Sequence, residues 1–251
     1  MKKEWVTLAI LCVILLSGCG SAKEEIHTQN KSEPASQPVT IASQPEKNFS
    51  GERIEMTKDE KVKLYASKQT DHMIEGVTLD VNGVFKEFNW KIPNTGTKPQ
   101  LLYTDLTGDG KEEVVVMIQT GRGTGLDHFD IHVINTDDLS EMKVQDYQDI
   151  VDNHIESHVT NTSNGIEVTV TTQGKESKFE HTSAIAAPDQ KELAFGGVIM
   201  YTIENQTIKL NLPGSVGVSP TYVCDFNVTY QYDRTNHQFI VDQIEVEPLI
   251  K

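Results

Sequence analysis

From about residue 52 to the end of the chain, apolar and polar residues alternate in short runs. Because successive side chains of a strand point to opposite faces, this alternation predicts strands rather than helices. The runs fall at residues 76–81, 84–90, 113–119, 128–134, 166–172, 175–181, 198–203, 207–212, 222–232 and 239–246. Between several of them lie residues that tolerate positive φ, as tight hairpin loops require: Asn82-Gly83, Asn164-Gly165, Gly174 and 233–236. The pattern therefore predicts a chain of antiparallel hairpins.

One predicted strand differs from the others, because the run Val114–Ile118 is apolar at every position. A strand of this kind is typical of the centre of a fold, with both of its faces covered. Helical signals are few: 57–60 has capping-box spacing, and 149–157 could form a short helix with apolar residues inward. We therefore predict a mainly β fold, in which antiparallel hairpins and meanders form a sandwich or a propeller-like stack with few short helices.

The first 51 residues follow a different pattern. Lys2 and Lys3 precede the apolar run 5–16, which is too short to cross a bilayer of about 30 Å as a helix. This arrangement predicts an export signal over residues 1–18. Residues 20–51 are rich in Ser, Gln, Glu, Lys and Pro, which predicts a disordered tether. The expected parts are therefore the signal at 1–18, an anchor and tether at 19–51, and a single β-rich domain at 52–251.

The end of the export signal reads Leu16-Ser17-Gly18-Cys19. These four residues resemble the lipobox of bacterial lipoproteins, in which the Cys thiol takes a diacylglyceryl group and becomes the new N-terminus. The resemblance implies that Cys19 is the lipidation site and anchors the protein at the extracytoplasmic face of the cell membrane. Two acyl chains on one residue give the double signal that stable anchoring requires. The alternative is an ordinary cleaved signal with a chance Cys.

The net charge and the cysteine content exclude some classes of function and some kinds of site. The formal net charge is −15, so the surface repels phosphates and we expect no nucleic-acid partner. Such a surface is compatible with cation binding. Of the three cysteines, only Cys224 belongs to the exported body, which therefore has no internal disulfide. Alternation around Cys224 predicts a buried small hydrophobe rather than a nucleophile.

The stretch 105–113 has the spacing of a calcium loop. It places oxygen-bearing side chains at loop positions 1, 3, 5 and 9 and a Gly at position 6, and a backbone carbonyl at position 7 adds another donor. An EF-hand also needs a Glu at position 12, which is Val116 here, so an EF-hand is excluded. Three carboxylates in one turn repel each other unless a cation or water lies among them. The predicted calcium ligands are Asp105, Thr107, Asp109, the Lys111 carbonyl and Glu113.

This nine-residue loop runs directly into the apolar strand, and residues 105–119 together resemble the FG-GAP or VCBS-type loop. In that family the loop binds calcium within β-propeller blades, so the resemblance implies a calcium site and an extracellular interaction role. The family usually repeats its loop and prefers Asp or Asn at position 3. This chain has one copy, with Thr107 at that position.

Other patterns predict no chemistry. The Gly-rich stretch 120–125 lacks the third Gly and the following helix of a nucleotide site, so we expect a hairpin loop. His128, Asp130 and His132 share one face of a strand, but the two histidines are about 13 Å apart, too far to share one zinc ion. A solvated polar face is expected instead. His154 and His158 do not fit H-E-x-x-H, because Glu156 is one place off.

Because no catalytic motif is present, we expect no enzymatic activity. The predicted function is that of a cell-surface lipoprotein whose calcium-stabilised β domain serves as a binding or structural module for an unknown protein or carbohydrate ligand. Two alternatives stay open. One is a cell-envelope hydrolase with its site near Gly121–Gly125. The other is a solute-binding lipoprotein, a class that usually has two α/β lobes.

Overall fold

The structure is a computed structural model that describes residues 51–249. The predicted signal, Cys19 and nearly all of the tether lie outside the described residues. The elements of the described part are β1 (Arg53–Met56), β2 (Val62–Ala66), β3 (Met73–Val81), β4 (Val84–Pro93), β5 (Gln100–Thr104), β6 (Glu113–Gly123), β7 (Leu126–Ile134), β8 (Glu141–Val144), α1 (Tyr147–His154), β9 (Ile155–Thr162), β10 (Gly165–Thr172), β11 (Lys175–His181), β12 (Val198–Glu204), β13 (Thr207–Val216), β14 (Thr221–Asp233) and β15 (Gln238–Pro248). The prediction of a mainly β fold with few short helices is confirmed.

Each strand expected from alternation is present, although most extend a few residues beyond the predicted ends. The turn signals are confirmed as well. Asn82 and Gly83, for example, have φ values of 52° and 87° and join β3 to β4 in register. The sequence did not reveal β1, β2, β5, β8 and β9. Four of these strands have only four or five residues and β9 is largely polar, so each gives little sequence signal.

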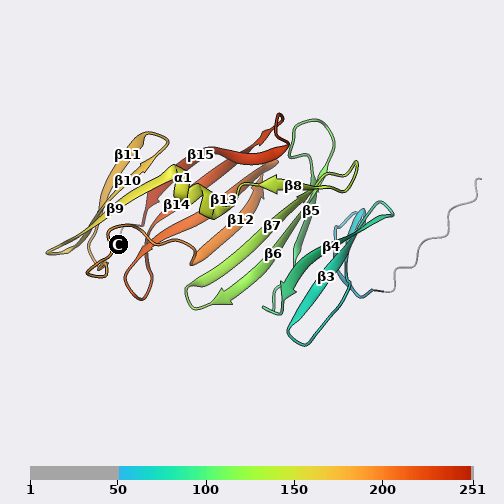
Figure 1. The fold of residues 1–251 in the computed structure, drawn as a ribbon, viewed down its shortest axis with the longest axis horizontal. Helices are drawn as coiled ribbons and strands as arrows, with labels where there is room; N and C mark the ends of the chain where they lie inside the picture. The colour runs from blue at the N-terminus through green and yellow to red at the C-terminus, as the bar shows by residue number, and fades with distance from the viewer. Residues whose placement is uncertain (1–50, 250–251) are drawn as a thin grey trace, which may run out of the picture. The chain divides into compact units, whose positions relative to one another are not determined.

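The strands form three sheets, whose orders are β1-β2-β3-β4, β11-β10-β9 and β12-β13-β14-β15-β8-β7-β6-β5 (Figure 1). Most neighbours are antiparallel, as expected. Two short pairings are parallel, between β12 and β7 and between β15 and β8. The β12–β7 pairing joins the first strand of the large sheet to its sixth. The strands β7, β8, β15, β14, β13 and β12 therefore close on themselves, and we call them the six-strand ring.

Strand β6 lies between two cores, as its apolar run predicts. Val115 and Met117 belong to the core that the ring encloses, whereas Val114, Val116 and Ile118 pack against the four-stranded sheet. All five side chains are at most 2 % exposed. Burying one such side chain contributes about 1.5–3 kcal/mol. The four-stranded sheet and the large sheet thus form a sandwich, in which β6 contributes side chains to both cores.

The helix predictions are only partly right. Helix α1 spans Tyr147–His154, and the Asp146 carboxylate caps it by accepting a bond from the Asp149 amide at 2.9 Å. Ile150 is fully buried, as expected. The predicted continuation to residue 157 is wrong, because Ile155 has an extended backbone and begins β9.

The predicted helical turn at 57–60 is also wrong. Thr57 and Asp59 side chains bond to each other at 2.7 Å, and Glu60 has a φ of 58°, so the segment forms the hairpin turn between β1 and β2. Strand β13 continues through a bulge between Gly214 and Ser215 to Val216. In the described part of the chain, no helix is long and apolar enough to cross a membrane.

Candidate functional site

The candidate metal loop, residues 105–112, joins β5 to β6. Both carboxylate oxygens of Asp105 accept backbone amides of the loop, from Gly108 at 2.7 Å and from Gly110 at 2.9 Å. The two glycines have φ values of 68° and 89°, a region that other residues enter at a cost. Asp105 and the two glycines therefore set the tight path of the loop.

Glu113 is the first residue of β6, and it is only 3 % exposed. Its Oε2 accepts the amides of Leu106 at 2.8 Å and Thr107 at 3.2 Å. Burial raises the pKa of the Glu113 carboxyl, and the nearby charges of Asp109 and Asp105 add to the increase, while the two amides oppose it. The net shift is upward. The structure thus brings negative charge near a buried carboxylate, as the loop spacing predicts.

The other predicted ligands are more exposed. The Asp109 carboxylate accepts the Lys111 amide at 2.9 Å, and the Thr107 hydroxyl lies 3.5 Å from the Glu113 Oε1. The Lys111 ammonium pairs with the Asp137 carboxylate at 2.5 Å, which raises the pKa of Lys111. The Lys111 side chain is thereby tied to the β7–β8 turn, and the atom of Lys111 that the loop spacing assigns to a cation is its carbonyl oxygen.

Two turns that are distant in sequence hold the loop. The Arg234 guanidinium, from the β14–β15 hairpin, donates to the carbonyls of Thr107 at 3.3 Å and Gly108 at 3.4 Å. On the other side, the Thr136 hydroxyl donates to the Glu112 carbonyl at 2.8 Å. Sequence reasoning missed Arg234, because it lies 127 positions from Thr107 and belongs to an ordinary turn motif.

The donor chemistry of the loop fits a hard cation, since every predicted ligand atom is an oxygen. As the side chains stand, however, residues 51–249 contain no group of three or more His, Cys, Asp or Glu that could hold a metal ion. The loop carboxylates are close enough to influence each other but do not converge on one point. Asp109 is exposed and bonded only within the loop, so it is the ligand that would have to move.

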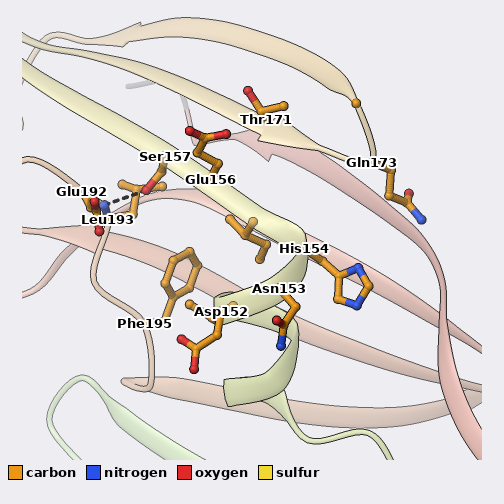
Figure 2. Close-up of a pocket in the computed structure, with 13 residues that line it drawn as sticks. Asp152, Asn153, His154, Glu156, Ser157, Thr171, Gln173, Glu192, Leu193 and Phe195 are labelled. Atoms are coloured by element: carbon orange, nitrogen blue, oxygen red, sulfur yellow. Dashed lines mark hydrogen bonds between the residues drawn. The ribbon is translucent and has the colours of Figure 1, made fainter.

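A second acidic region lines a cleft of about 830 Å³ between the α1–β9 junction, the β10–β11 turn and residues 192–195. Its carboxylates are Asp152, Glu156 and Glu192, and all three residues are exposed. Figure 2 shows Asp152, His154 and Glu156 pointing in different directions, while the Ser157 hydroxyl accepts the Leu193 amide at 3.0 Å. His154 ends α1 and His158 lies in β9, so the two histidines do not share a helix.

The polar face predicted on β7 is only partly solvated. Asp130 is exposed, but His128 and His132 are half-buried. The His132 ring stacks on Trp90 with centroids 4.2 Å apart, and its Nδ1 lies 2.6 Å from the Glu141 carboxylate. The His128 ring contacts the Gly196 carbonyl. The histidines therefore serve packing between strands, which sequence spacing alone did not reveal.

Two further expectations are confirmed. The Gly-rich stretch forms the β6–β7 hairpin, with Gly125 at a φ of 69° and its carbonyl bonded to the Tyr222 hydroxyl at 2.8 Å. Cys224 is fully buried, and burial raises the pKa of its thiol to about 12, so it is a poor nucleophile. The cleft of Figure 2 lies at Gly174, away from the Gly121–Gly125 hairpin.

Comparison with protein-family models, with curated proteins and with solved structures gives no match. The predicted lipidation residue, Cys19, lies outside the described residues.

Proposed function

We propose that this protein is a cell-surface lipoprotein, anchored through Cys19, whose β domain is stabilised by calcium and serves as a binding or structural module. The observation that carries the calcium part is the crowding of charge around Glu113, whose pKa is raised by burial and by Asp109 and Asp105. A cation among these groups would offset the repulsion. The lipobox resemblance at Leu16–Cys19 supports the anchor.

In this proposal the carboxylates of Asp105, Asp109 and Glu113, the Thr107 hydroxyl and the Lys111 carbonyl hold the ion. Each carboxylate oxygen has two lone pairs, so accepting one backbone amide does not prevent it from binding a cation. The ion would neutralise the carboxylates and fix the loop between the turns that carry Thr136 and Arg234. Extracellular modules commonly bind calcium at about 10⁻⁴ to 10⁻³ M, which suits a surface protein.

The calcium site is tested with Tb³⁺, which replaces Ca²⁺ in oxygen sites and luminesces when a nearby tyrosine transfers energy to it. The tyrosine expected to transfer energy is Tyr232, because it lies close enough to the loop to be influenced by its charges. Burial, and then the charges of Glu113 and Asp109, raise the pKa of the Tyr232 hydroxyl. We expect tyrosine-sensitised luminescence that calcium displaces. Asp109→Ala should abolish it, whereas Tyr232→Phe should reduce the signal but keep calcium binding. Equal luminescence from Asp109→Ala would place the ion elsewhere.

The same site is tested by thermal unfolding of the full-length chain in detergent, with calcium and with a chelator. Calcium at 100 times its dissociation constant should add about 2.7 kcal/mol to the free energy of unfolding. Asp109→Ala should remove this increment. An unchanged midpoint in the unmodified protein, with no luminescence, would contradict the calcium proposal.

The anchor is tested independently by expressing the chain with Cys19→Ser and separating membranes from soluble material. We expect the unmodified protein in the membrane fraction and the variant in the soluble fraction, because the variant has no thiol at position 19 to carry a lipid. Ser17→Ala is a matched control, since it keeps a small residue before the Cys. Membrane attachment that survives Cys19→Ser would overturn the anchor proposal.

A further inference from the structure

One edge of β7 is left partly open. Its first edge pairs with β6 along nearly the whole strand. Its second edge pairs with β12 only at Asp127 and His128, and with β8 only at Val133 and Ile134. Among residues 51–249, no strand therefore pairs in register with this edge over Phe129–His132, and we call this segment the β7 gap.

The backbone groups that point into the β7 gap can be identified from the bonds at its two ends. The Asp127 amide donates to the Gly197 carbonyl at 2.9 Å, and the Asn135 amide donates to the Ser140 carbonyl at 2.9 Å. Alternate residues of a strand direct their backbone groups to the same edge. The pair between Ile199 and His128 uses the Phe129 amide, so the Phe129 carbonyl and both backbone groups of Ile131 are what the β7 gap leaves without a strand partner.

A cavity of about 510 Å³ lies at the β7 gap, and its two sides differ in character. On one side Phe129 and Ile131 pack against the core of the ring, together with the buried Tyr201. Asp130 and His132 point to the opposite face of β7, because side chains alternate along a strand. Glu141, which bonds to His132, lies with them. One side of the cavity is thus apolar and the other is acidic.

The acidic side of the cavity carries negative charge that a basic ligand could pair with. The Asp130 side chain is exposed, and its carboxylate makes no hydrogen bond or ion pair with the other described residues. Glu141 and Asp146 add two more carboxylates to the lining, although Glu141 already bonds His132 and Trp90 and Asp146 caps α1. Lys143 is the one Lys or Arg among the described residues that line the cavity. A ligand that fits both sides would be apolar on one face and basic on the other.

We propose that the β7 gap binds an extended peptide segment of alternating apolar and basic residues, which adds as a strand to Phe129 and Ile131. Backbone bonds to a sheet edge provide affinity in this mode of recognition, and alternate side chains provide specificity. The apolar side chains pack beside Tyr201, and the basic side chains lie near Asp130. This proposal names a partner for the binding module proposed above and does not involve the metal loop.

The probe is a fluorescein-labelled Val-Lys-Val-Lys-Val peptide, and its binding to the full-length protein in detergent is followed by fluorescence anisotropy. Two further peptides carry N-methyl groups, one on the Val amides and one on the Lys amides. Only one of these two should lose binding, by about tenfold or more, because only one set of amides faces β7. A Val-Glu-Val-Glu-Val peptide should not bind, because its charge is reversed.

Asp130→Asn should weaken binding about two- to fivefold, as expected for one exposed charge pair. Asp242→Asn, an exposed acid on β15, is the matched control and should change nothing. The proposal is overturned if the peptide shows no saturable binding, or if both methylated peptides bind like the parent, which would indicate general attraction to an acidic protein. It is also overturned if the protein dimerises and the peptide does not compete, which would assign the edge to a second copy.

The peptide test and the metal test fail independently. Peptide binding should be equal in calcium and in chelator, because no residue of the β7 gap belongs to the metal loop. Failure of the peptide to bind overturns the β7 gap proposal while terbium luminescence stays intact. Peptide binding that disappears in chelator would contradict the separation of the two sites and overturn the proposal in this form.

Discussion

The metal loop and the cleft of Figure 2 are both acidic, yet their carboxylates differ in burial and in hydrogen bonding. In the loop, Asp105 and Glu113 each accept two backbone amides, and Glu113 is almost fully buried. In the cleft, Asp152 and Glu156 are exposed and point in different directions. The energetic consequences of an acidic residue thus depend on burial and on backbone donors. The number of acidic residues in a region is a poor guide.

The largest difference is expected between Glu113→Ala in the loop and Glu156→Ala in the cleft. Removing the Glu113 carboxylate leaves the Leu106 and Thr107 amides without an acceptor, which should cost about 1–3 kcal/mol. Glu156→Ala should stay within about 0.5 kcal/mol of the unmodified protein. The measurement is urea unfolding in chelator.

Glu113→Gln sharpens this result, because the raised pKa of Glu113 indicates that its charge does not stabilise the folded state. The Gln carbonyl oxygen still accepts amides, so this variant should be nearly as stable as the unmodified protein in chelator and yet lose its response to calcium. Equal losses from Glu113→Ala and Glu156→Ala would remove the distinction between loop and cleft.

Gly110 in the loop and Gly174 at the cleft give a matched pair with an intermediate effect. Both have positive φ, 89° and 74°, and a Cβ at either would meet nothing within 4 Å. Replacement by Ala should therefore cost about 1–2 kcal/mol at each site, from backbone strain alone. Only Gly110→Ala should also weaken the stabilisation by calcium, in thermal unfolding with and without the ion. The same calcium response from both variants would count against the loop.

The smallest effect is expected at Arg234, whose guanidinium donates to two loop carbonyls. Arg234→Gln removes a positive charge beside the loop, so calcium affinity should rise about two- to fivefold while stability falls by less than about 1 kcal/mol. Calcium titration of terbium luminescence measures the affinity. Lys191→Gln, beside the cleft, should leave the affinity unchanged. A lower affinity in Arg234→Gln would mean that Arg234 positions the loop rather than opposing the cation.

The sequence predicted what local patterns encode. The apolar run Val114–Ile118 predicted the central strand, because covering both faces of a strand leaves a local signature. The hairpins followed from turn residues such as Asn82-Gly83. The helical turn predicted at 57–60 is wrong, because Glu60 has a positive φ, which the capping-box spacing does not predict.

Features that depend on distant segments could not be predicted in this way. The parallel pairings that close the ring join segments that are far apart in the sequence. The local pattern of each segment does not identify its partner. For the same reason the support that Arg234 gives to the loop was missed. The loop spacing located Asp105 and Glu113 near each other, but it did not reveal that backbone amides occupy their oxygens.

The ring has a consequence for how the domain opens. Only two residue pairs close it, between β12 and β7, whereas eight pairs join β13 to β14. The closing pairs join residues that are 71 positions apart (198 and 127, 199 and 128), so forming them requires a large loss of chain entropy for few bonds. Breaking them should cost less than separating β13 from β14, so the Asp127 amide should exchange with deuterium sooner than the amides between β13 and β14. Solvent would thus reach the ring core at this contact, beside His128 and Gly196, before it enters between β13 and β14.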